Sequence, residues 1–251
     1  MKVSIITVTY NSGKYLSSAI NSVISQHHPD IEYIIVDGGS QDNTVSLIKS
    51  FGSSVTHFIS EPDGGIYDAM NKGITLASGD VICFLNSDDF YIDSFVISDV
   101  VKLFEQDKKI DIVLGNVDYV FPHDLNKPIR TLSSYSFSPY KMRFGFMPAH
   151  PGAFVRRPRF IKVGLFDISY KIAADFEWFV RAFHVFNLHC KKLNKTLVRM
   201  RMGGVSTAGI SSTLIITSEM NRALRENSIL SSFLLVSLRL PIKLFQKLFF
   251  R

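Results

Sequence analysis

The sequence is poor in cysteine, and what it lacks narrows the classes of protein to consider. Two cysteines, Cys83 and Cys190, stand far apart among 251 residues, with no Cys-x-x-Cys pair. This argues against a disulfide framework and against a zinc site. The amino terminus has neither the long apolar core nor the small-residue cleavage site of a signal peptide. We therefore expect the chain to fold from residue 1 and to work in the reducing cytoplasm.

The charge is modest and unevenly placed. Charged residues make up 20% of the chain, which argues against a disordered chain. Apolar residues make up 46%, which is enough for the core of one large domain, with or without an appendage. The net charge is +6, but residues 227–251 hold four basic residues and no acidic one. A basic excess on an apolar tail favours a membrane surface, and not nucleic acid, as the partner.

Strand and helix patterns alternate over the first part of the chain. Strands are predicted at 3–9, 31–36, 55–60 and 81–85, with helices between them at 15–25, 44–51 and 66–77. This alternation predicts an α/β fold with a mostly parallel sheet, whose ligands bind at the carboxyl ends of the strands. Further on we expect helices at 95–104 and 173–186, strands at 110–116 and 190–201, and an irregular segment at 118–140.

The chain is predicted to divide into a domain at 1–209 and a helical tail at 210–251. The apolar run in the tail is broken by basic residues and Pro241, and is therefore too short to span a bilayer, which needs about 20 residues. Its basic residues recur every four positions, which would place them on one helix face: Arg239, Lys243, Lys247 and Arg251. This predicts a helix lying in a membrane interface over residues 229–251. A helix packed on the domain, or on a partner subunit, is the alternative.

Asn86-Ser87-Asp88-Asp89 directly follows the apolar run at 81–85. Adjacent carboxylates at the end of a buried strand repel each other. A divalent cation such as Mg²⁺ relieves that repulsion and also bridges phosphates. Because Asn, Ser and Asp are also common in turns, a plain turn is the alternative.

Further polar groups follow other predicted strands. Asp37 ends the second strand before paired glycines, and Asp42 is the better candidate to cap the next helix. The segment 61–73 places Asp63 before another helix, where a surface ion pair of Asp68 with Lys72 would explain part of the pattern. Asp175 and Glu177 open a late helix, as either a positioned general base or acids suited to the helix dipole. His150, between two prolines, is a base or phosphate partner or simply structural.

Taken together, these segments resemble family 2 glycosyltransferases of the GT-A fold, which have helices on both faces of the sheet. The likeness covers about residues 1–206 and rests on the opening 4–11, the loop 37–44, Asn86–Asp89 as an Asp-x-Asp-like motif, and Asp175. The segment 61–73 further resembles the branch that builds bacterial O-antigen and exopolysaccharide.

The resemblance implies roles for individual residues. Asp88 would ligate Mn²⁺ or Mg²⁺, and Asp175 would deprotonate the acceptor hydroxyl for an inverting transfer. The UDP part of the donor would be held by Thr9, Tyr10, Asp37, Asp63, Asn86 and Ser87. His150, Glu177 and Gly204 would border the acceptor as a closing wall. The chain departs from the family pattern at Asn86, which replaces an Asp, and at Asp175-Phe176-Glu177, which replaces a Glu-Asp pair and leaves Glu177 as a competing base.

The expected activity is transfer of a hexose, glucose or galactose before N-acetyl sugars, from a UDP-sugar to a lipid-diphosphate-linked sugar in surface polysaccharide biosynthesis. The enzyme would sit peripherally on the cytoplasmic membrane face. A non-catalytic UDP-sugar-binding or scaffold protein of the same pathway is the alternative. A nucleotidyltransferase fits less well, because Asn11-Ser12-Gly13-Lys14 is a poor match to its Gly-rich basic loop.

Overall fold

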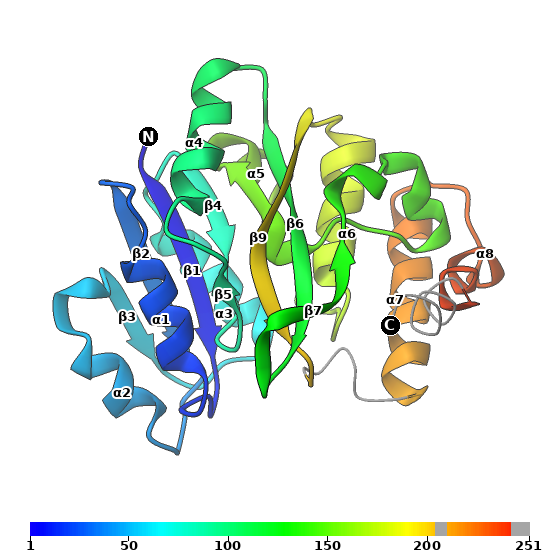
Figure 1. Cartoon of the computed structure of the whole chain (residues 1–251). Helices are drawn as coiled ribbons and strands as arrows, with labels where there is room; N and C mark the ends of the chain where they lie inside the picture. Colours follow the sequence, from blue (N-terminus) through cyan, green and yellow to red (C-terminus); the bar gives the residue numbers. More distant parts are fainter. Residues whose placement is uncertain (204–209, 242–251) are drawn as a thin grey trace.

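The computed structural model describes residues 1–203 and 210–241 and shows a single mixed sheet with helices on both sides (Figure 1). The order of its strands is β3-β2-β1-β4-β8-β6-β9-β5, with β7 added to β6. The strands are β1 Val3–Thr9, β2 Ile31–Asp37, β3 His57–Ser60, β4 Val81–Phe84, β5 Phe90–Tyr91, β6 Ile112–Phe121, β7 Asp124–Leu132, β8 Ala153–Arg156 and β9 Cys190–Arg201. The predicted α/β class is confirmed.

The first four strands are parallel, as the sequence predicts. β1 pairs with β2 and with β4, and β2 pairs with β3, all in parallel register. β1, β2 and β4 are almost wholly buried, because continuous apolar runs suit strands that are covered on both faces. Their carboxyl ends therefore meet at one edge, drawn at the bottom of Figure 1.

Helices cover the two faces in separate groups. Buried residues of α1 Leu16–Ile24, α2 Thr44–Ser50 and α4 Val96–Gln106 share one hydrophobic core. Buried residues of α3 Ile66–Leu76, α5 Arg157–Val163, α6 Ala174–Val180 and α7 Ile210–Glu226 share the other. The late helix predicted at 173–186 is α6 followed by a π-helical turn, Arg181–Val185.

The segment 118–140, predicted to be irregular, is mostly regular, and that prediction was wrong. β6 runs on to Phe121, and β7 pairs with it in antiparallel register with two irregularities near Val120. β7 is largely exposed and contains Lys127 and Pro128, so it lacks the apolar alternation by which a strand is recognised.

The carboxyl-terminal helices pack on the domain. Met220, Ala223 and Leu224 of α7 are buried in the core shared with α6, and the short α8, Phe233–Ser237, contributes Val236. The predicted boundary at residue 209 thus does not separate two cores. Arg239, predicted on an exposed basic face, is 2% exposed, and its guanidinium donates to Thr217 Oγ1 at 2.8 Å. That placement was wrong for Arg239, while Lys243, Lys247, Arg251, Leu244, Phe245 and Leu248 lie outside the described residues.

Glu32 joins the amino ends of β1, β2 and β4. Its carboxylate accepts hydrogen bonds from Lys2 Nζ at 2.8 Å, Ser4 Oγ at 2.5 Å and Ser78 N at 2.7 Å. Burial alone would raise the pKa of Glu32, but these hydrogen bonds outweigh it and hold the pKa at about 2. The carboxylate therefore stabilises the fold above pH ~4.5, and this contribution is lost as the pH falls toward 2.

We expect Glu32→Gln to lower the free energy of unfolding by about 2–3 kcal/mol at pH 7, and to flatten the loss of stability between pH 4.5 and 2. Urea unfolding at several pH values measures both effects. Glu105→Gln is the control, because Glu105 is exposed and its ion pair with the terminal amine spans 3.8 Å. Equal losses in the two variants would contradict this role of Glu32.

Candidate functional site

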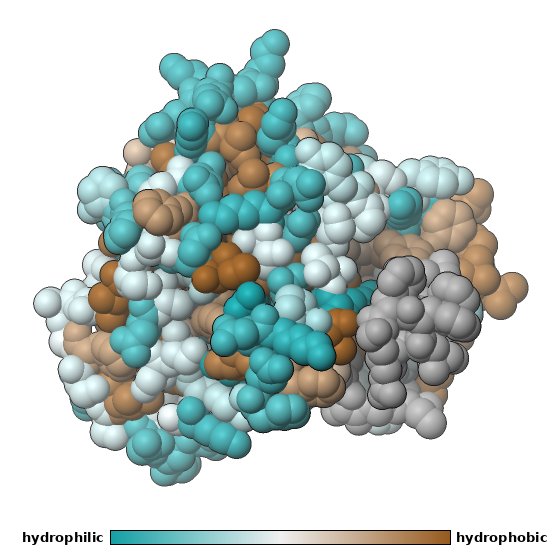
Figure 2. Space-filling view, in the orientation of Figure 1, coloured by the Kyte–Doolittle hydropathy of each residue, from teal (hydrophilic) through white to brown (hydrophobic). Residues whose placement is uncertain are grey.

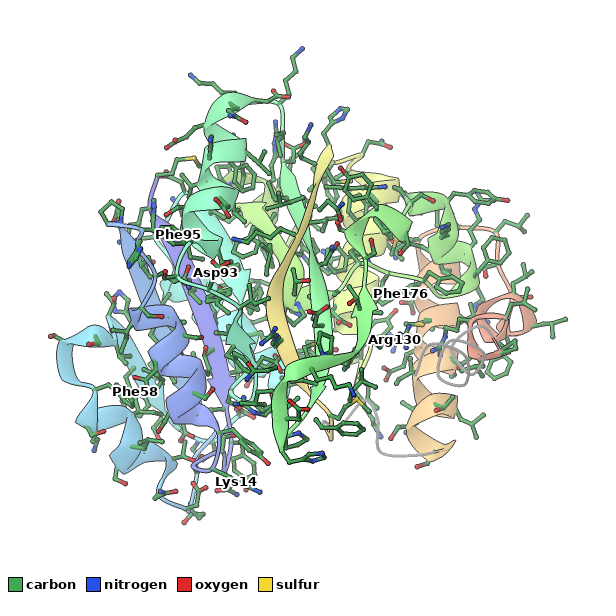
Figure 3. All side chains as sticks on the ribbon, viewed as in Figure 1. Lys14, Phe58, Asp93, Phe95, Arg130 and Phe176 are labelled. Atoms are coloured by element: carbon green, nitrogen blue, oxygen red, sulfur yellow. The ribbon has the colours of Figure 1, made fainter. Side chains whose placement is uncertain are left out.

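The loops that follow β1 and β2 are tied together at the carboxyl edge of the sheet. Asn11 Oδ1 accepts from Gln41 N at 2.9 Å, and Ser12 N donates to Thr44 Oγ1 at 2.8 Å. Asp42 accepts from Thr44 N, as a helix-capping residue should, and also from Gly13 N. Lys14, labelled in Figure 3, lies in the first of these loops at the lower edge of the molecule.

Asp37 is fully buried at the end of β2. Its carboxylate accepts from Gly39 N at 3.1 Å, Ser40 N at 2.9 Å and Ser60 Oγ at 2.8 Å, and from the Ser40 hydroxyl. Asp37 therefore shapes the loop after β2, and any contact with a uridine would have to share these oxygens. Its predicted role as a direct ligand stays a prediction.

Asp63 lies against the same loop. A Cβ atom on Gly38 would come within 2.6 Å of Asp63 Oδ2, so a larger residue at 38 would displace the Asp63 carboxylate. Asp63 Oδ1 accepts from Gly65 N at 2.8 Å, at the start of α3. Two acidic loops that are separated in the sequence thus meet at the edge of the sheet.

The turn at 86–89 completes this edge beyond β4. Ser87 Oγ donates to Ser12 Oγ at 3.0 Å, which links the turn to the loop after β1. Asn86 Nδ2 donates to Asp89 Oδ2 at 2.9 Å. Asn86 therefore holds the inner carboxylate, which is 1% exposed, while Asp88 keeps partial solvent access.

Burial raises the pKa of Asp88, and burial together with the neighbouring Asp88 raises the pKa of Asp89 well above its ordinary value. Two neighbouring acids in this state fit a divalent cation, which would favour the ionised form of Asp88. Within residues 1–203 and 210–241 no three acidic, His or Cys side chains cluster as metal ligands. A cation here would thus take Asp88 as a protein ligand and its other oxygens from a diphosphate and water, as Mg²⁺ commonly does.

Arg201 binds the backbone of the acidic turn at 86–89. It ends β9, is 6% exposed, and its guanidinium donates to the Asp88 carbonyl and to Ser18 Oγ. The guanidinium carbon also lies 5.0 Å from the ring centroid of Tyr15 and 4.7 Å from that of Phe90. The Arg201 guanidinium, enclosed by these two rings, holds the backbone of the turn. Because it binds the Asp88 carbonyl, the Asp88 carboxylate stays available to a ligand.

Thr9 and Tyr10 lie at the end of β1. The Thr9 hydroxyl is buried and has no hydrogen-bond partner among the described residues, and the Thr9 carbonyl accepts from Gly38 N at 2.9 Å. Tyr10 is 62% exposed. One residue thus faces the interior of the sheet edge, and the next offers an aromatic ring to solvent.

Asp175 lies in the first turn of α6, on the face of the sheet that α3 also covers. Its Oδ1 accepts from Phe176 N at 2.8 Å and lies 3.4 Å from Tyr67 Oη of α3, whose hydroxyl donates to the Ile172 carbonyl. Burial raises the pKa of Asp175 to about 6, against the smaller opposing effect of these hydrogen bonds. The side chain keeps partial solvent access, so it can exchange a proton near neutral pH.

Glu177, the competing base, is engaged elsewhere. Its two oxygens accept from Arg181 at 2.7 and 2.8 Å, and the same guanidinium donates to the carbonyls of Val163 and Leu165. Both members of the ion pair are largely buried. Glu177 therefore anchors α6 to the segment after α5, which leaves Asp175 as the better candidate for a base.

His150 packs among aromatic rings near the end of β4. Its ring centroid lies 4.9 Å from that of Phe84 and 5.7 Å from that of Phe166. Burial lowers the pKa of His150 to about 4, so the imidazole is neutral at pH 7 and does not attract phosphate by charge. Gly204, predicted in the closing wall, lies outside the described residues.

The two groups of acids face a common region. Tyr119 of β6 lies within electrostatic reach of both Asp89 and Asp175, and both carboxylates raise its pKa after the larger effect of burial. Arg130 of β7, labelled in Figure 3, is paired with Tyr119 across the hairpin. Its positive charge lowers the pKa of Tyr119 and so opposes the two carboxylates. The structure thus gathers the predicted metal motif and the predicted base around β6.

Three residues of this region were not predicted from the sequence: Tyr67, Arg201, and Glu219 of α7, whose carboxylate accepts from Ala173 N at 2.9 Å just before α6. The i,i+4 spacing of Glu177 and Arg181 was the one usable sequence signal for a contact found here. Tyr67 and Glu219 act through contacts across more than one hundred and across 46 residues, respectively, and such contacts leave no local pattern.

Comparison with known proteins connects this geometry to a family. The family model for glycosyl transferase family 2 matches residues 4–167. The chain is 33% identical over 183 residues, 72% of its length, to an uncharacterized glycosyltransferase of Mycobacterium tuberculosis, of which it covers 68%. It is 28% identical over the same length to a PGL/p-HBAD biosynthesis glycosyltransferase of Mycobacterium bovis, of which it covers 69%.

Solved structures share the fold. The structure of S. aureus TarS 1–349 with UDP-GlcNAc aligns with a TM-score of 0.68 at 18% identity, over 90% of this chain and 71% of that one. A second structure of S. aureus TarS 1–349 aligns with a TM-score of 0.67 at 19% identity, and this chain covers 65% of it, less than two thirds. The mannosyltransferase PcManGT of Pyrobaculum calidifontis, with GDP-Man and Mn²⁺, aligns with a TM-score of 0.63 at 14% identity, over 98% and 80% of the two chains.

Proposed function

The chain belongs to glycosyltransferase family 2, and from this premise we propose that it moves a hexose from a UDP-sugar to a lipid-diphosphate-linked sugar, with inversion at the anomeric carbon. The product would enter the biosynthesis of a surface polysaccharide such as O-antigen or exopolysaccharide. One observation carries the proposal: the acidic turn that holds Asp88 and Asp89, and Asp175 at the start of α6, both lie within electrostatic reach of Tyr119 on β6, and burial raises the pKa of all three acids.

The edge of the sheet supports binding of a nucleoside diphosphate. Tyr10 is exposed beside the unpartnered Thr9 hydroxyl and can stack on a base, while Asp63 and the backbone near Gly38 line the ribose side. Asn86 and Ser87 orient the turn that presents Asp88. The TarS structures were solved with UDP and with UDP-GlcNAc, which supports a UDP-sugar donor here.

The residues at 86–89 fit a divalent cation bound together with the donor, Mn²⁺ or Mg²⁺. When bound, such an ion stabilises the negative charge that develops on the departing diphosphate. Asp88 would hold it, Asn86 would keep Asp89 turned inward, and Arg201 would fix the backbone of the turn. The neighbouring fold of PcManGT was solved with Mn²⁺.

Asp175 would accept the proton from the acceptor hydroxyl. A base with a pKa of about 6 is ionised at pH 7 and is basic enough to assist attack on the anomeric carbon. The attacking oxygen would displace the diphosphate in one step from the opposite face of the sugar, which inverts the anomeric configuration. Glu177 takes no part, because Arg181 binds both of its oxygens.

An exposed apolar surface near the carboxyl terminus supports a lipid-linked acceptor and a peripheral place on the cytoplasmic membrane face. Leu230, three residues before α8, is 80% exposed, and Leu234 within α8 is 74% exposed. Figure 2 shows a brown, hydrophobic surface at the right of the molecule, where Figure 1 places α8. The 3₁₀ helix Pro139–Phe144, which contacts α8, adds exposed Tyr140 and the cations Lys141 and Arg143. Within the two described ranges, 1–203 and 210–241, no helix has the length and hydropathy to cross a bilayer.

We expect the double substitution Leu230→Asp and Leu234→Asp to weaken binding to phosphatidylglycerol vesicles by at least 10-fold, because it removes apolar contact and adds negative charge. Flotation with vesicles measures the change. Lys108→Asp and Lys109→Asp, which add negative charge in the turn after α4, should reduce binding much less. Unchanged binding by the leucine variant would exclude this surface as the membrane contact.

The overall reaction is tested with the full chain, a panel of UDP-hexoses and a synthetic lipid-diphosphate monosaccharide, with and without Mn²⁺. We expect transfer with UDP-glucose or UDP-galactose and an inverted linkage by NMR. UDP binding without turnover on any donor and acceptor would favour the non-catalytic sugar-nucleotide-binding protein. A retained anomeric configuration would overturn the single-displacement mechanism.

A further inference from the structure

The segment that leads into α6 has a backbone whose hydrogen bonds are not supplied by its neighbours in the sequence. α6 begins after Ala173, and no side chain of its own caps it. Three consecutive backbone N–H groups instead converge on one carboxylate from α7. Glu219 Oε1 accepts from Lys171 N at 2.7 Å, and Glu219 Oε2 accepts from Ile172 N at 3.0 Å and from Ala173 N at 2.9 Å.

Glu219 therefore acts as a cap supplied from a distant helix. A carboxylate at this place satisfies free N–H donors and also suits the positive end of the dipole of α6. Hydrogen bonds to a charged group are stronger than those between neutral groups. Three of them on one side chain fix the segment 171–173 firmly with respect to α7.

The opposite side of this segment is held by α3. Tyr67 donates to the Ile172 carbonyl, and its oxygen lies 3.4 Å from Asp175 Oδ1. The segment is thus held between Tyr67 and Glu219, and Asp175 follows it directly. A shift of this backbone would move the Asp175 carboxylate, because Ala174 at the start of the helix is itself completely buried and cannot absorb the change.

We call the hydrogen bonds of Tyr67 and Glu219 to the segment 171–173 the clamp. α7, which carries Glu219, is itself packed firmly on the domain. Met220, Ala223 and Leu224 bury one face of it in the core. Arg222 donates to Ser169 Oγ at 2.9 Å, and Glu226 accepts from Tyr170 Oη at 2.7 Å, so two further contacts join α7 to the same segment. Figure 1 shows α7 standing beside α6 at the right of the sheet.

We propose that Glu219 is a positioning residue for the reaction: from α7 it sets the backbone at 171–173 and thereby the place of Asp175 beside the acceptor. This rests on the proposed function, in which Asp175 is the base. Glu219 does not touch the substrate. The carboxyl-terminal helix is on this view part of the active site's support and not only a route to the membrane.

Two side chains from other elements act on the ionisation of Asp175. Burial has the largest effect and raises the pKa of Asp175, the hydrogen bonds from Phe176 N and from Tyr67 of α3 lower it, and the negative charge of Glu219 on α7 raises it. Tyr119 of β6 also lies within electrostatic reach of Asp175, and its own pKa is raised by the Asp175 carboxylate. Removing the charge of Glu219 should therefore move the acid limb of the pH–rate profile to lower pH, which a purely structural cap would not do.

The test compares Glu219→Gln, Glu219→Asp and Glu105→Gln in the full chain. Glu219→Gln replaces a doubly accepting carboxylate by one carbonyl and an NH₂ group that repels N–H donors. We expect a fall in kcat of about 10–100-fold at little change in the KM of the donor, since small displacements of a catalytic group cost this much. Glu105→Gln, the same change at an exposed position of α4, should leave kcat within about threefold. Glu219→Asp keeps the charge and should retain the acid limb with an intermediate kcat.

A second readout does not depend on turnover. Amide hydrogen exchange at 171–173 should accelerate at least 10-fold in Glu219→Gln and remain unchanged in Glu105→Gln, and the ¹³C-carboxyl titration of Asp175 should move to lower pH in Glu219→Gln. Unchanged exchange and an unchanged titration in a folded Glu219→Gln protein would overturn the clamp. If these changes occur while the wild type transfers no sugar, the clamp stands and the proposed function fails.

Discussion

Asp175→Asn should lower the rate of sugar transfer by about 10²–10⁴-fold and, at the same time, make the folded protein more stable. The loss of rate follows from removing a general base. The gain in stability follows from the raised pKa of Asp175, because burial makes its charge costly in the folded state. At pH 7.5 we expect a gain of about 1–2 kcal/mol, less than the full shift implies, since the carboxylate keeps some solvent contact. Binding of UDP should be unchanged within about twofold. Initial rates, thermal unfolding and calorimetry with UDP measure the three effects.

The sign of the pH dependence makes the result specific. In the folded protein the pKa of Asp175 lies at about 6, above the usual value of 3.8, so the wild type gives up stability as pH rises from about 3.8 to 6 and kcat/KM rises through pH 6. Asp175→Asn should lose both dependences.

Glu177→Gln is the matched comparison on the same helix. It should destabilise the protein by about 1–3 kcal/mol, because it breaks a buried ion pair with Arg181, and should retain most of the rate at temperatures where it is folded. If Glu177→Gln loses the rate while Asp175→Asn keeps it, the assignment of the base is reversed.

Asp88→Asn is expected to reduce kcat/KM by about 10²–10³-fold and to abolish stimulation by Mn²⁺. The amide cannot offset the charge of a divalent ion that neutralises the leaving diphosphate. The pKa of Asp88, raised by burial, also predicts that Mn²⁺ binding in the presence of UDP weakens as the pH is lowered, because protons compete with the ion for this carboxylate. Electron paramagnetic resonance of Mn²⁺ with UDP measures the binding without turnover.

Asn86→Asp is the instructive counterpart, since it makes the motif more acidic. Asn86 Nδ2 donates to Asp89 at 2.9 Å, so an aspartate there would place two carboxylates face to face within a buried turn. We expect lower stability and no gain in Mn²⁺ affinity. Tighter Mn²⁺ binding by Asn86→Asp would show instead that the first position faces the ion. Wild-type activity that survives EDTA undiminished would mean that the motif binds the diphosphate or ribose directly.

The first half of the fold could be predicted from the sequence because its strands are buried on both faces. The largely apolar and β-branched segments at β1, β2 and β4, each followed by a polar loop, define the parallel sheet and the edge at which ligands bind. The positions of Asp63, Asp88 and Asp175 in that frame also follow from local pattern. These residues come directly after strands, or at the start of a helix.

The places of several other residues could not be predicted, because they depend on contacts that the sequence does not show. Arg239 has a spacing that suits an amphipathic helix, yet it is buried against Thr217 and Gly145, since a long side chain can find a partner that periodicity does not show. Asp37 looked like a ligand because the hydrogen bonds that occupy it could not be seen in the sequence: its partners are Ser40 in the following loop and Ser60 at the end of β3. Glu219 carries no motif at all. The roles assigned to the donor-binding residues stay predictions for the same reason.

β7 has a consequence for the behaviour of the protein in concentrated solution. A strand with one open side is a template on which another chain can add a strand, and long flat edges promote aggregation. β7 contains Pro128, which lacks a backbone donor, and the charged Lys127, and its pairing with β6 is twice irregular. These features make β7 a poor template. The polar hairpin that obscured this strand in the sequence thus protects the sheet from association with other copies of itself.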